Sequence, residues 1–92
     1  MSGPAYQRRA DVMFTVLDGE VLALDALHGH CFGMNPVASA VWNLLEQPRT
    51  LADLCEELEG EFDVGPERCR EEVQQLLVQL QQEKLVQLHP VS

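Results

Sequence analysis

Ninety-two residues are enough for one domain with a single modest core, and too few to enclose a deep substrate cavity. The chain is 46% hydrophobic, but no apolar run approaches the roughly 20 residues that a bilayer span needs, which excludes a transmembrane protein. Acidic residues outnumber Lys and Arg by 15 to 6, so the chain repels a nucleic-acid backbone and attracts a basic partner. These properties favour binding in a surface groove over catalysis.

The N-terminal residues 1–10 read as a flexible segment, and we expect a single domain over residues 11–90. The segment shows no basic start followed by an apolar stretch, so it does not resemble a secretory signal. We therefore expect a cytoplasmic protein that does not contact a membrane.

Three strand-like runs come first in the domain, at residues 12–17, 20–25 and 30–34. The first two are separated by Asp18-Gly19, a pair that favours a tight type I′ hairpin. The turn Leu27-His28-Gly29 precedes the third run. The simplest arrangement of these runs is a three-stranded antiparallel meander.

Three helical patterns follow the strands. Asn35 and Pro36 form a favourable start for the first, which is expected to run to about Glu46. Thr50 is expected to cap the second helix and Gly60 to end it. The third and longest helix begins after Gly65-Pro66.

The segments around the third helix are also apolar. Phe62 and Val64 are expected to fold back as a core plug before this helix. After it, Leu85, Val86 and Leu88 predict a short terminal strand.

This order predicts an α+β, winged helix-turn-helix-like fold, in which a three-stranded antiparallel sheet is followed by three helices. Such domains often bind nucleic acid, yet the second helix carries only acidic charges, at Asp53, Glu56, Glu57 and Glu59. A helix that reads the major groove needs Arg, Lys, Asn or Gln with basic flanks. We predict no nucleic-acid partner.

A groove between the third strand and the third helix is the main candidate site. An edge strand keeps unpaired N–H and C=O groups that can recruit an extended peptide, while a neighbouring helix supplies pockets for its side chains. The pattern does not separate helix residues that line the groove from those that belong to the core. The residues placed at this peptide-binding site are His30, Cys31, Phe32, Gly33 and Met34 on the strand and Cys69, Glu72, Val73, Leu76 and Leu77 on the helix.

Two other kinds of site are weighed and not predicted. His28, His30 and Cys31 are zinc-donor residue types, but no second pair of ligands accompanies them. A cysteine nucleophile needs a base and an orienting group, and no local signature of that kind is present. The three cysteines, Cys31, Cys55 and Cys69, are interpreted as buried thiols. We predict no catalytic residue, no metal and no cofactor.

The chain resembles the PqqD family of peptide-recognition elements from about Gly19 to Leu88. The resemblance depends on the order and spacing of several short motifs. They are Asp18-Gly-Glu-Val-Leu-Ala-Leu-Asp25, Cys31-Phe-Gly-Met-Asn35, Ala40-Val-Trp-Asn-Leu-Leu45, Thr50-Leu-Ala-Asp-Leu54, Glu61-Phe-Asp-Val64 and the pattern from Val73 to Val86. The chain departs from the family at Cys31, where an aromatic residue is frequent.

The resemblance implies a module that binds the leader segment of a ribosomally synthesised precursor peptide and presents it to modifying enzymes. The leader would lie as an added strand against the third strand, packed toward the third helix. Stand-alone members of this length resemble the B1 proteins of lasso-peptide pathways, whose partners are a leader peptidase and a macrolactam cyclase. Other members serve radical SAM enzymes. The alternative function is that of an acidic winged-helix adaptor or regulator that binds a folded protein.

Overall fold

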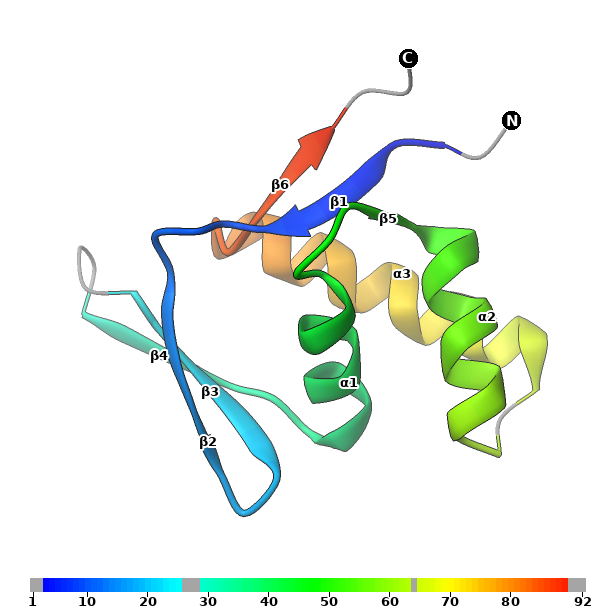
Figure 1. The fold of residues 1–92 in the computed structure, drawn as a ribbon, viewed down its shortest axis with the longest axis horizontal. Coiled ribbons are helices and arrows are strands. Elements are labelled where there is room, and N and C mark those ends of the chain that lie inside the picture. The colour runs from blue at the N-terminus through cyan, green and yellow to red at the C-terminus, as the bar shows by residue number, and fades with distance from the viewer. Residues whose placement is uncertain (1–2, 26–28, 64, 90–92) are drawn as a thin grey trace.

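The structure is a computed structural model that describes residues 3–25, 29–63 and 65–89. Within these residues the chain forms six strands and three helices (Figure 1). The strands are β1 (Ala5–Arg8), β2 (Met13–Leu17), β3 (Glu20–Asp25), β4 (His30–Gly33), β5 (Arg49–Thr50) and β6 (Val86–His89). The helices are α1 (Pro36–Leu44), α2 (Leu51–Glu61) and α3 (Pro66–Gln82). The predicted α+β class is confirmed, and the three predicted strands and three predicted helices follow one another as β2, β3, β4, α1, α2 and α3. The sequence did not predict β1, which precedes them, or β5, which lies between α1 and α2.

Strands β2, β3 and β4 form the predicted antiparallel meander, in that order. The turn between β2 and β3 has Asp18 at φ 53° and Gly19 at φ 82°, with Leu17 paired to Glu20. Positive φ at both central residues is what a type I′ turn requires, so the predicted hairpin is confirmed. Leu27 and His28 of the predicted second turn lie outside the described residues.

A second antiparallel sheet has the order β5-β1-β6. Residues 1–10 were expected to be flexible, but Ala5–Arg8 instead form β1, the central strand of this sheet, in register with His89–Val86 (Figure 1). The sequence Ala-Tyr-Gln-Arg has no apolar alternation, so it gives no local sign of a strand. The strands that pair with it, β5 and β6, lie far along the chain. Residues 5–8 are therefore part of the folded unit.

Arg8 ties this second sheet to the rest of the molecule. Its Nη1 donates a hydrogen bond to the carbonyl oxygen of Trp42 at 3.3 Å. Its guanidinium also lies 4.8 Å from the centre of the Phe14 ring and 5.7 Å from that of the Trp42 ring. These two aromatic rings meet edge to face, with centroids 5.6 Å apart. One side chain of β1 thus contacts both β2 and α1.

The helices begin where their capping residues predict. The Asn35 side chain accepts a hydrogen bond from the N–H of Ala38 at 2.8 Å, and Pro36 occupies the first helical position of α1. Thr50 and Asp53 form a complete capping box at the start of α2. The three predicted helices are confirmed, with α1 ending at Leu44 and α2 at Glu61.

The core lies between the helices and the inner face of β3. Its largest fully buried side chains are Trp42, Leu45, Leu54, Leu58, Leu77, Leu80, Val21, Val41 and Val73. Phe62 packs against this core as predicted, whereas Val64 lies outside the described residues. Among the described residues, no helix is long and apolar enough to cross a bilayer.

Candidate peptide-binding site

The β4 strand is an edge of its sheet, and its backbone geometry determines what that edge offers. The N–H of Met34 donates a hydrogen bond to the carbonyl oxygen of Val21 at 2.9 Å. Because hydrogen-bonded and non-bonded pairs alternate along an antiparallel ladder, the register of β4 on β3 turns the N–H and C=O groups of Phe32 toward β3. Those of Cys31 and Gly33 point the opposite way.

The outward side of β4 has no strand beside it in the part of the chain that the structure describes. Cys31 and Gly33 therefore present two N–H and two C=O groups along this side. An unpaired row of this kind is a template for an additional strand. The predicted open edge is present in the structure.

A cavity of about 330 Å³ lies near the C-terminal end of this edge, between the start of α1 and α3. Strand β4 ends at Gly33, and Asn35, which lines the cavity, follows two residues later. The residues that line it are Asn35, Val37, Ala38, Glu72, Gln75, Leu76 and Gln79. The floor is apolar and the rim carries amide and carboxylate groups, so the cavity suits a side chain with an apolar body.

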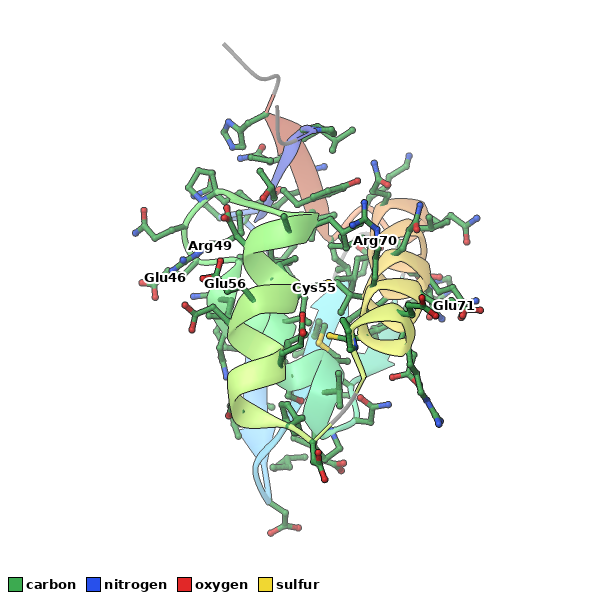
Figure 2. The ribbon with its side chains drawn as sticks, turned by 90° about the vertical axis from the view of Figure 1, so that its right-hand side faces the viewer. Glu46, Arg49, Cys55, Glu56, Arg70 and Glu71 are labelled. Carbon is green, nitrogen blue, oxygen red and sulfur yellow. The ribbon has the colours of Figure 1, made fainter. Side chains whose placement is uncertain are left out.

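The spacing of residues on α3 divides the helix into two faces. Cys69, Val73, Leu77 and Leu80 are buried in the core. The cavity-lining positions 72, 75, 76 and 79 follow the same three-and-four spacing, displaced around the helix toward α1. Figure 2 shows Glu71 on the side of α3 that faces away from α2. The helix therefore has a core stripe, a cavity stripe and a solvent stripe.

Of the helix residues predicted for the site, the structure brings Glu72 and Leu76 to the cavity. The side chains of Cys69, Val73 and Leu77 are at most 3% exposed and pack in the core. Sequence reasoning missed the lining residues Asn35, Val37, Ala38, Gln75 and Gln79. The helical spacing from Glu72 predicts the last two, whereas nothing in the sequence places the start of α1 against α3.

The strand residues also separate into two groups. Met34 is 4% exposed and belongs to the core, and Phe32 is partly buried against it. His30, Cys31 and Gly33 are exposed. The prediction that all three cysteines are buried is wrong for Cys31, because the pleat turns its side chain to the outer face of the sheet.

Among the described residues that line the cavity, Glu72 alone carries a charge. Glu72 accepts a hydrogen bond from Nε of Arg68 at 3.1 Å, in an exposed pair one helical turn apart.

The core stripe of α3 contains a buried thiol. Burial, and then the neighbouring Cys55, raise the pKa of the Cys69 thiol to about 11. Figure 2 shows Cys55 on the side of α2 that faces α3. Cys69 is therefore a protonated core thiol at neutral pH.

The described residues contain no group of three or more His, Cys, Asp or Glu side chains placed to hold a metal ion. Of the three residues weighed as ligands, His28 lies outside the described part of the chain. His30 and Cys31 are adjacent in β4, so their side chains project to opposite faces of the sheet.

The fold and its open edge define a winged-helix-like α+β domain with a strand and a cavity available to an extended chain. The chain belongs to the PqqD family, because the family described as "Coenzyme PQQ synthesis protein D (PqqD)" matches residues 16–86. This confirms the resemblance found in the sequence. No curated protein matches the chain.

Two solved structures have the same fold. One, described as "TbiB1 in Complex with the TbiA(beta) Leader Peptide", has a TM-score of 0.79 at 23% identity and covers 88% of this chain and 94% of that one. The other, described as "Lasso peptide synthetase B1 complexed with the leader peptide", has a TM-score of 0.78 at 18% identity, covering 89% and 96%. At these identities the likeness establishes the fold.

Proposed function

We propose that this protein binds the leader segment of a ribosomally synthesised precursor peptide as an added strand on β4. The observation that carries the proposal is the outward row of backbone groups at Cys31 and Gly33, next to the cavity between α1 and α3. It is supported by family membership and by the two similar structures, both of which are described as complexes with a leader peptide.

The two parts of the site have different roles in this function. Hydrogen bonds to the β4 backbone involve no protein side chain, so they hold an extended chain with little regard to its sequence. Alternate side chains of an added strand project to one face of the sheet, and those on the inner face point toward the helices. The cavity beside Leu76 then selects one apolar or aromatic leader residue.

The partners that we propose are the precursor peptide, a leader peptidase and a macrolactam cyclase, as in lasso-peptide biosynthesis. The protein itself carries out no reaction in this proposal and presents its bound peptide to those enzymes. A formal net charge of −9 favours a leader with Lys or Arg residues and accelerates its association.

The test is fluorescence polarisation with fluorescein-labelled leader peptides synthesised from any short precursor reading frame that neighbours the gene of this chain. Single N-methylation of successive leader residues removes one backbone donor at a time and leaves the protein unchanged. An antiparallel added strand bonds through alternate residues, so we expect affinity losses with a period of two over at least four residues. Absence of binding would overturn the proposal, and losses without this period would overturn strand addition.

The second candidate function is an adaptor that binds a folded protein. It is favoured by the exposed apolar side chains of β2, where Met13 is 65% exposed and Leu17 59% exposed. Paired substitution of Met13 and Leu17 by Thr discriminates between the two functions, because β2 is the opposite edge of the sheet from β4. Leader binding should be unaffected by this change, whereas an adaptor interface on β2 would be lost.

A further inference from the structure

The outer face of the β2-β3-β4 sheet is apolar and uncovered by any described element. Val21 and Ala23 are each 1% exposed on the inner face, so Leu22 and Leu24 project outward from β3. The register places Leu22 beside Gly33 and Leu24 beside Cys31 on β4. Two leucines thus form a floor that extends to the open edge, and at Gly33 no side chain stands between the floor and that edge.

The glycine at position 33 has no explanation within the described part of the chain. Its φ lies outside the left-handed region, and a Cβ placed on it would meet no atom within 4 Å. Glycine weakens a strand, because it loses more conformational freedom on folding and packs no side chain. Such a residue in a strand marks a place where a ligand or another backbone approaches closely.

We propose that the bare backbone of Gly33, together with Leu22, is a subsite for an aromatic side chain of the bound peptide. This inference rests on the proposed function, since it needs the peptide to be paired with β4. A residue opposite Gly33 in the added strand projects to the same outer face as Gly33. An aromatic ring at that position covers the glycine backbone and lies on Leu22, an arrangement that compensates for glycine at sheet edges.

The subsite gives the leader a two-sided pattern. The residue opposite Gly33 is aromatic and lies on the outer face, while its neighbours in sequence turn to the inner face. One of those neighbours is directed toward the cavity lined by Val37 and Leu76. The protein therefore contacts the side chains of consecutive peptide residues on opposite faces of the sheet.

The exposed thiol of Cys31 allows the register to be measured independently. It lies on the same outer face, two residues before Gly33, whereas Cys55 and Cys69 are buried. Leader variants that carry one cysteine activated as a thiopyridyl disulfide are mixed with the protein. The Cys31 thiolate attacks the peptide sulfur, a new disulfide forms, and thiopyridone leaves with the bonding electron pair. The fastest leader position marks the residue opposite Cys31, with Cys31→Ser as the control.

In an antiparallel strand, the residue two positions before the trapped one lies opposite Gly33, and we expect it to be aromatic. Leu22→Thr and Gly33→Thr should each weaken leader binding by about threefold to tenfold in fluorescence polarisation. Leu24 lies two residues after Leu22 on the same face of β3, beside Cys31 and not Gly33. Leu24→Thr is therefore the matched control and should change affinity by less than about twofold. Replacing the aromatic leader residue by Ala should abolish the effect of Leu22→Thr.

Failure of the subsite and failure of the proposed function give different results. If the wild-type protein does not bind the leader, both are overturned. If it binds, but the residue opposite Gly33 is not aromatic or Leu22→Thr behaves like Leu24→Thr, only the subsite is overturned. Circular dichroism of each variant establishes that the sheet is intact.

Discussion

The backbone N–H of Val21 donates a hydrogen bond to the Ser39 hydroxyl at 2.8 Å, although Val21 lies in β3 and Ser39 in α1. The same hydroxyl donates to the carbonyl oxygen of Met34 at 3.2 Å. Ser39 thus bridges the two backbone groups at the point where β4 leaves the sheet. It fixes the start of α1, and with it one wall of the cavity, relative to the open edge.

Replacing Ser39 by Ala should therefore destabilise the protein. Ser39 is 3% exposed, so the change leaves one buried donor and one buried acceptor without this partner. We expect a loss of about 1–3 kcal/mol in the free energy of unfolding, measured by urea denaturation. Thr15→Ala on the exposed β2 is the control, expected to change this free energy by about 0.5 kcal/mol or less. Equal effects of the two changes would show that the bridge has no energetic role.

The division of α3 into stripes predicts that leader binding depends on the cavity stripe and not on the solvent stripe. Leu76 lines the cavity, whereas Val78 is 48% exposed on another face of the same helix. Leu76→Ala should weaken leader binding by about tenfold, since an apolar contact of a ligand with a leucine contributes about 1–2 kcal/mol. Val78→Ala should leave affinity within about twofold, a difference well below that contribution. Fluorescence polarisation on both variants measures this, and a similar loss for Val78→Ala would contradict the assignment of the cavity.

The parts of the fold that were predicted from the sequence depend on local chemistry. Asp18-Gly19, Asn35-Pro36 and Thr50 determine turns and helix starts through their own backbone preferences and side-chain hydrogen bonds. Strand β1 was missed because its stability comes from pairing with residues more than forty positions away, and Tyr6 and Arg8 show no local strand pattern.

The site was predicted in outline and not in detail, for a similar reason. The open edge follows from the strand order, which is local. Which face of α3 meets the cavity depends on how α1 packs against it, and Val37 gives no sign of this contact in the sequence. Met34, Cys69, Val73 and Leu77 are apolar at positions compatible with either role, and only the packing assigns them to the core.

The contacts of Arg8 predict that the N-terminal strand contributes to stability. Arg8→Met keeps an apolar stem but removes the hydrogen bond to Trp42 and the cation–π contacts with Phe14 and Trp42. We expect a loss of about 1–2 kcal/mol in the free energy of unfolding, followed by circular dichroism in urea. The neighbouring Arg9→Met removes only an exposed ion pair with Asp11 and should cost about 0.5 kcal/mol or less. An Arg8→Met protein as stable as the wild type would show that these side-chain contacts of Arg8 make no net contribution to stability.

The buried thiol of Cys69 predicts a loss of stability at alkaline pH. Burial, and then the neighbouring Cys55, raise its pKa from the usual 9.0 to about 11 in the folded protein. Below pH 9 the thiol is protonated in both the folded and the unfolded state. As the pH rises through the window from 9 to about 11, the unfolded chain releases this proton while the folded protein retains it, so unfolding becomes progressively more favourable.

Urea unfolding at several pH values across this window measures the effect. Cys69→Ala should start from a lower stability, because it leaves a small void in the core, but should lose less stability with rising pH than the wild type. Cys31→Ala, which removes an exposed thiol, should follow the wild-type slope. If Cys69→Ala and the wild type lose stability in parallel, other groups that titrate in this range account for the alkaline transition, and the Cys69 proton has no part in it.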